Sequence, residues 1–89
     1  MSASIEEIEQ TVIKMVASFK KVDPSTFNRD SVLNEDMDIQ SLDLVDILMD
    51  LEDVYKIELI DDQLLSRAGD NPVTVAIVAN FIAEKVNNK

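Results

Sequence analysis

Ser41 is the residue whose type and position could support a reaction. It stands where a loop becomes a helix, and residues 36–43 around it include Asp36, Asp38 and Asp43. A serine at a helix start is most often a cap, since its hydroxyl can accept a hydrogen bond from a free backbone N–H group. A phosphate ester on the same hydroxyl would also be favoured there, because free N–H groups and the helix dipole attract an anion. The position alone leaves both interpretations open.

The composition argues against a self-contained enzyme. The sequence has no Cys and no His, which removes disulfides, thiolate or imidazole metal sites, Cys nucleophiles and the usual general base. Nothing near Ser41 could activate it as a nucleophile, and Lys56 is fifteen residues away. A calcium loop starting at Asp36 also fails, because it would need Gly in place of Ser41 and Glu in place of Ile47. Any reaction at Ser41 would therefore be catalysed by another protein, and we expect neither a catalytic residue nor a metal site.

The net charge is strongly negative. Eight basic against eighteen acidic residues leave −10 at pH 7, which repels nucleic acid and anionic membranes and favours basic partners. Residues 30–55 hold nine acids and no basic residue. There is no signal-peptide pattern and no run of the ~20 apolar residues that span a bilayer. We therefore expect a cytoplasmic protein without a membrane span.

The apolar pattern predicts the elements that must hold Ser41. Ser4 followed by Glu7 is a capping-box pattern. A helix to about Lys20 follows from the helical spacing of Ile5, Ile8, Val12, Met15, Val16 and Phe19. Across residues 22–40 the apolar residues no longer follow helical spacing. A loop of that length tends to be functional, and its scattered apolar residues indicate that it packs across the helices.

Three further helices are expected. The second runs from residue 41 to about 55, and after a short connector two aspartates can cap a short third helix, with Gly69 suited to a left-handed exit. Thr74 can cap a final helix that runs to about Val86. The first residues of this segment are largely β-branched and would fit a strand only if a second strand could pair with it. We expect one all-α domain over 1–89, with three main helices, one short helix and a long loop between the first two.

Residues 41–55 form three stripes when placed on a helical wheel at about 100° per residue. An apolar stripe roughly 120° wide has the width of a core-facing side and comprises Leu44, Ile47, Leu48, Leu51, Val54 and Tyr55. The far side is acidic, with Asp43, Asp46, Asp50 and Asp53. A second apolar stripe on one flank consists of Leu42, Val45 and Met49. The wheel leaves open whether this second stripe is further core beneath the loop or an apolar strip at the surface.

The acidic stripe destabilises its own helix. Like charges three or four residues apart cost about 0.2–0.5 kcal/mol per pair, and no Lys or Arg on this helix compensates. Asp50 and Asp53 also lie in the C-terminal half, where the helix dipole disfavours anions. A solvated face is the simplest explanation of such a stripe, but its cost favours a surface kept for a basic partner.

These residues resemble the acyl carrier protein family. The family motif is a Glu-Asp-Leu-Gly-x-Asp-Ser-Leu-Asp run that leads into an acidic second helix, followed by an aromatic residue and an Ile-Glu-Ile-like connector. Residues 35–43 follow the run, and residues 52–59 follow the end of the helix and the connector. The match is close over about 32–62, and element order and length extend it over nearly the whole chain. The resemblance implies a four-helix bundle.

The resemblance also implies a covalent cofactor at Ser41. In the family, the motif serine receives 4′-phosphopantetheine from coenzyme A through a separate phosphopantetheinyl transferase that uses Mg²⁺, and the thiol of the arm carries acyl groups as thioesters. The other expected partners are acyl-loading and acyl-processing enzymes with basic docking patches, which would meet a monomeric carrier. The docking residues would be Leu42, Asp43, Val45, Asp46, Met49, Asp50, Glu52 and Asp53. This assignment places the second apolar stripe at the surface.

Two alternatives remain beside a carrier for fatty-acid, polyketide or another specialised acyl pathway. The cargo could be an aminoacyl group, as in D-alanyl or peptidyl carriers. The chain could instead be an unmodified acidic adaptor in which Ser41 is only a cap. Three departures from the family pattern bear on this choice. Gln40 replaces the Asp that usually precedes the serine, and Asp38 replaces a Gly, although Asp tolerates a left-handed backbone. Residues 64–73 are longer than the family's short third helix and following loop, which border its acyl cavity.

Overall fold

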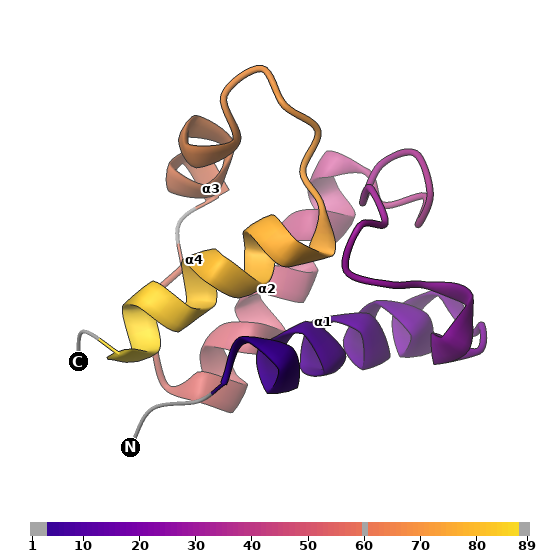
Figure 1. Ribbon diagram of the computed structural model, residues 1–89, viewed down its shortest axis with the longest axis horizontal. Helices are drawn as coiled ribbons and strands as arrows, with labels where there is room; N and C mark the ends of the chain where they lie inside the picture. Colours follow the sequence, from indigo (N-terminus) through magenta and orange to yellow (C-terminus); the bar gives the residue numbers. More distant parts are fainter. Residues whose placement is uncertain (1–3, 60, 88–89) are drawn as a thin grey trace.

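Four α-helices and one short 3₁₀ turn make up the computed structural model, which describes residues 4–59 and 61–87 (Figure 1). The side chains of residues 41, 61, 62 and 67 lie outside the description. The elements are α1 (Ile5–Lys20), η1 (Pro24–Thr26), α2 (Ser41–Tyr55), α3 (Asp61–Ala68) and α4 (Val75–Asn87). Within the described ranges no β-strand occurs. The predicted all-α fold, with three main helices and one short one, is confirmed.

Helix α1 begins and ends as its sequence predicts. The Ser4 hydroxyl accepts a hydrogen bond from the Glu7 N–H at 3.1 Å, which satisfies one of the donors left free at a helix start. Beyond Lys20 the chain turns at Lys21, whose φ of 60° is left-handed. The buried face is rotated from the predicted one: Ile13 and Ala17 are buried, whereas Phe19 is exposed. Phe19 lies in the last turn, within the predicted stripe, but the face that the core covers is shifted toward Ile13 and Ala17.

The loop between α1 and α2 packs across the helices, as predicted. Leu33, Met37 and Ile39 are buried in the same core as the helices. The short turn η1 is capped by Asp23, which accepts a hydrogen bond from the Ser25 N–H at 2.8 Å. This bond, together with the Ser25 side chain, lowers the pKa of Asp23. The loop is therefore a fixed layer of the fold.

Backbone hydrogen bonds join this loop to the start of α4. The Val75 N–H donates to the Ser31 carbonyl at 3.1 Å, and the Ala76 N–H donates to the Arg29 carbonyl at 2.9 Å. The Thr74 hydroxyl accepts from the Ile77 N–H at 3.2 Å, so the predicted cap is confirmed. These acceptors come from outside the helix because its first N–H groups have no partner within it. Loop docking and the start of α4 therefore depend on each other.

Helix α4 lies along α1 and completes the core (Figure 1). Its inner face buries four large side chains, Val75, Val78, Phe81 and Ile82. The short helix α3 adds Leu64, which is also fully buried, and ends at Gly69 with the predicted left-handed φ, 62°. The segment 69–74 then leads back to α4 as a wide loop (Figure 1). This arrangement leaves the start of α2 beside the long loop and the 69–74 segment.

Candidate functional site

Ser41 is the first residue of α2, but it is not the helix cap. The residue before the first helical one has an extended backbone, and here that residue is Gln40, with φ −84° and ψ 171°. Its N–H donates to a carboxylate oxygen of Asp43 at 3.1 Å, and its carbonyl accepts the first bond of the helix, from Leu44. The interpretation of Ser41 as a cap is therefore wrong. The side chain of Ser41 lies outside the described side chains.

The turn before Ser41 is held at several points. Asp38 has a left-handed φ of 54°, so the left-handed turn that was expected with Asp in place of Gly is present. On either side of it Met37 and Ile39 are buried, and the Ile39 N–H donates to the Leu33 carbonyl at 2.8 Å. These anchors fix where the chain enters α2.

Lys20, at the end of α1, also contacts this turn. Its Nζ donates to the carbonyl oxygen of Asp38 at 3.0 Å and to the carboxylate oxygen Oδ2 at 3.3 Å. The Gln40 side chain donates from Nε2 to the other carboxylate oxygen, Oδ1, at 3.4 Å. Lys20 was not among the predicted site residues, because nothing in its local sequence pattern points to a residue eighteen positions away.

The core-facing stripe of α2 is largely as predicted. Ile47, Leu48 and Leu51 are buried, and Leu44 and Tyr55 pack against the core as partly buried residues. Val54 is exposed, which corrects its assignment to this stripe. On the wheel it lies at the edge next to the acidic side, and it belongs to the last turn of the helix, so the core does not cover it.

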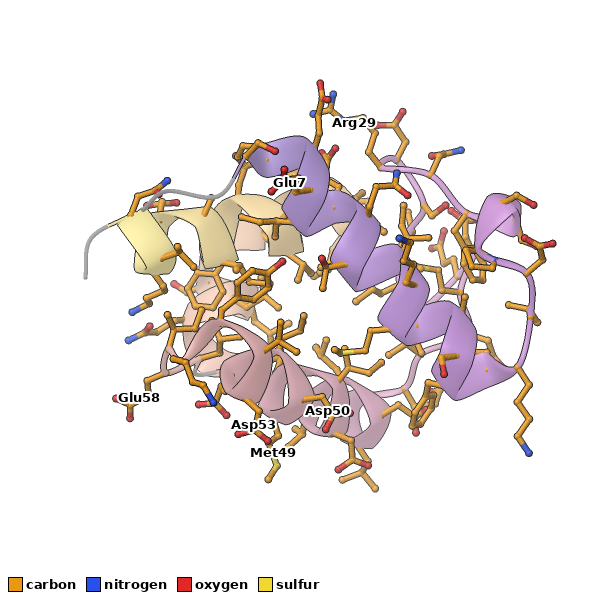
Figure 2. The ribbon with its side chains drawn as sticks, turned by 90° about the horizontal axis from the view of Figure 1, so that it is seen from below. Glu7, Arg29, Met49, Asp50, Asp53 and Glu58 are labelled. Carbon is orange, nitrogen blue, oxygen red and sulfur yellow. The ribbon has the colours of Figure 1, made fainter. Side chains whose placement is uncertain are left out.

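The second apolar stripe lies at the surface. The exposed fractions are 82% for Leu42, 37% for Val45 and 56% for Met49. Figure 2 shows Met49, Asp50 and Asp53 along one edge of the molecule, with Glu58 from the connector on the same side. The structure thus brings apolar and acidic side chains together on one outward face. Glu58 was not among the predicted docking residues, although it lies only three residues beyond the end of the acidic helix.

The predicted acidic docking residues divide into two groups. Asp46, Asp50 and Asp53 are exposed, whereas Asp43 and Glu52 are partly buried. Asp43 binds the N–H of Gln40, and Glu52 accepts a hydrogen bond from the Leu59 N–H at 3.0 Å, which holds the connector after α2. The first group offers charge to a partner, while the second group also stabilises the two ends of its own helix.

A cavity of about 480 Å³ opens beside the start of α2. Its apolar lining includes Leu33, Ile39 and Leu44, and its polar lining includes Gln40 and Asn71. The cavity therefore lies between the long loop, the first turn of α2 and the 69–74 segment. Space of this kind next to Ser41 is large enough for a small organic group.

The chain is similar to curated proteins of known family. It is 35% identical over 83 residues to the acyl carrier proteins of Rickettsia canadensis and Rickettsia rickettsii, which is 93% of this chain and 91% of each relative. The acyl carrier protein of Rickettsia typhi is 34% identical over the same lengths. This chain belongs to the acyl carrier protein family. A scan against family models gives no match.

Family membership makes the chain a carrier protein without enzymatic activity of its own. Its all-α fold is the helical bundle of the acyl carrier proteins. Among the described helices none is both long and apolar enough to cross a membrane. In the described residues no group of three or more acidic side chains is arranged to hold a metal ion.

Proposed function

We propose that this carrier holds acyl intermediates as thioesters on a 4′-phosphopantetheine arm attached to Ser41. The observation that carries the proposal is the place of Ser41 in the fold. It opens the acidic helix α2, and its neighbours Gln40 and Leu42 are both exposed, so an enzyme can reach the start of the helix. When attached, the arm would supply the thiol that this Cys-free chain lacks.

The surroundings of Ser41 fit such a group. The N-terminal end of α2 favours the anionic phosphodiester through its dipole, and Lys20 offsets the charge of the nearby Asp38. The cavity beside Gln40 offers apolar walls at Leu33, Ile39 and Leu44. An acyl group could therefore be partly sheltered from water next to its attachment point.

The outward face of α2 suits the enzymes that would load and process the cargo. Leu42, Val45 and Met49 give an apolar strip, and an adaptable Met can fit several partners. Asp46, Asp50 and Asp53 beside it are exposed and can attract a basic patch. We expect a transferase and acyl-processing enzymes to dock here, with Asp43 and Glu52 contributing less because they already bond within the chain.

The test is the intact mass of the protein after incubation with coenzyme A, Mg²⁺ and a broad-specificity phosphopantetheinyl transferase. We expect the parent chain to gain one phosphopantetheine and Ser41→Ala to gain none. Ser66→Ala, which removes an exposed serine from α3, is the matched control and should be modified like the parent.

A parent chain that stays unmodified, with a transferase shown active on another carrier, would favour the unmodified acidic adaptor instead. With the arm in place, the acyl species recovered from cells separates the remaining alternatives. Fatty-acid, polyketide and other acyl cargo differ in mass from aminoacyl cargo such as D-alanyl.

A further inference from the structure

Lys20, on α1, brings a positive charge to the turn that precedes Ser41. Residues 30–55 contain no basic residue, so a positive charge near this region must come from elsewhere in the chain. Lys20, in the last turn of α1, supplies it through its two hydrogen bonds to Asp38. The side chain of Lys20 is 27% exposed and that of Asp38 is 77% exposed. The Lys20 side chain is thus mostly covered, and its ammonium donates to the turn.

Both carboxylate oxygens of Asp38 are used within the chain. Oδ2 receives the Lys20 ammonium and Oδ1 receives the Gln40 amide, so Asp38 connects the end of α1 with the residue that precedes Ser41. The carbonyl of Asp38 is bound by Lys20 as well, which fixes the peptide plane and not only the side chain. The contacts therefore act on the backbone conformation of the turn, which is left-handed at Asp38.

We propose that Lys20 is a positioning residue for the modification of Ser41, because it holds the turn that presents Ser41 to the transferase. The inference rests on the proposed arm at Ser41. In that transfer Ser41 Oγ bonds to the phosphorus of the phosphopantetheine moiety while the pyrophosphate bond of coenzyme A breaks. Adenosine 3′,5′-bisphosphate leaves, and the hydroxyl proton passes to a base of the transferase. Lys20 acts on this reaction through Asp38 and Gln40.

The expected kinetic effect is that of a turn which, without Lys20, is correctly formed for only part of the time. If loss of Lys20 lowers the fraction of chains whose turn is formed, the apparent affinity for the transferase falls in proportion to the fraction that remains formed. We therefore expect Lys20→Met to raise KM for the carrier about two- to five-fold, the range that a partly exposed ion pair supports, with little change in kcat. Lys20→Arg keeps the charge and the donor and should restore most of the loss.

The controls use the same helix and the same turn. Lys14→Met removes an equal charge from an exposed position of α1 and should leave KM unchanged. Asp38→Gly keeps the left-handed turn, since glycine adopts positive φ without strain, but it removes the carboxylate. In the Asp38→Gly background, Lys20→Met should therefore have a smaller effect than in the parent chain, because the two residues act together.

Amide hydrogen exchange of the unmodified protein tests the turn without any transferase. Lys20→Met should speed exchange at Ile39 and Gln40 about two- to five-fold, while Lys14→Met and Lys20→Arg should match the parent. Unchanged exchange in Lys20→Met overturns the proposal, and so does an equal rise of KM in Lys14→Met. A parent that gains no arm overturns the proposed function and this role with it, whereas a modified parent with the same KM in Lys20→Met overturns the role alone.

Discussion

The Arg29 guanidinium lies against a buried carboxylate on α1, with Arg29 Nε 3.2 Å from Glu9 Oε2. The Glu9 side chain is 7% exposed and that of Arg29 is 60% exposed. The two groups form an ion pair without a directed hydrogen bond. Arg29 also accepts the Ala76 N–H at its carbonyl, so one loop residue joins α1 to α4. Arg29 lies at the opposite edge of the molecule from Met49 and Asp53 (Figure 2).

This pair predicts unequal effects of its two truncations. Arg29→Met leaves the Glu9 charge buried without its partner and should lower the free energy of unfolding by about 1–3 kcal/mol. Glu9→Gln removes the charge itself and should cost less. Urea unfolding followed by circular dichroism measures both, with Lys14→Met as an exposed control within about 0.5 kcal/mol of the parent. Equal stability of Arg29→Met and the parent would show that the ion pair contributes nothing.

Two leucines of α2 should separate stability from docking. Leu51 is fully buried, so Leu51→Ala should lower the free energy of unfolding by about 2–5 kcal/mol. Leu42 is exposed, and Leu42→Ala should change stability by less than about 0.5 kcal/mol. It should nevertheless reduce kcat/KM for phosphopantetheine transfer about tenfold, the effect of losing a central apolar contact at an interface. Parent-like transfer to Leu42→Ala would remove Leu42 from the docking surface.

The exposed acids of α2 predict stabilisation by cations. Asp46 and Asp50 are four residues apart on one helix and repel each other, and added Mg²⁺ should screen that repulsion. We expect Tm to rise with Mg²⁺ in the parent chain and to rise less in Asp46→Asn/Asp50→Asn. The measurement is thermal unfolding by circular dichroism at several Mg²⁺ concentrations. A flat response in the parent would mean that these acids are too far apart to repel appreciably.

The helices were predictable because their signals are local. Ser4 and Thr74 cap α1 and α4, and the apolar spacing behind each cap continues to the helix end. The burial of Glu9 was not predicted, although it is in step with Ile5, Val12 and Val16 on one side of α1. A charge on that side is stable only with a partner, and Arg29 is twenty residues further along the chain.

The site was predictable in its outline and not in its contacts. The start of α2 at Ser41 and the surface position of the Leu42, Val45 and Met49 stripe agree with the structure. The cap at Gln40 and the contact between Lys20 and Asp38 depend on how the loop folds back on α1. The sequence pattern around Ser41 does not indicate how the loop folds back on α1.

The proposed function requires Ser41 to carry the arm in the cell. Fragmentation mass spectrometry of the chain isolated from its own organism measures this on the peptide that contains Ser41. We expect loss of a pantetheine fragment from that peptide, with acyl groups on part of the population. An unmodified Ser41 peptide, in an extract where another carrier protein bears the arm, would contradict it.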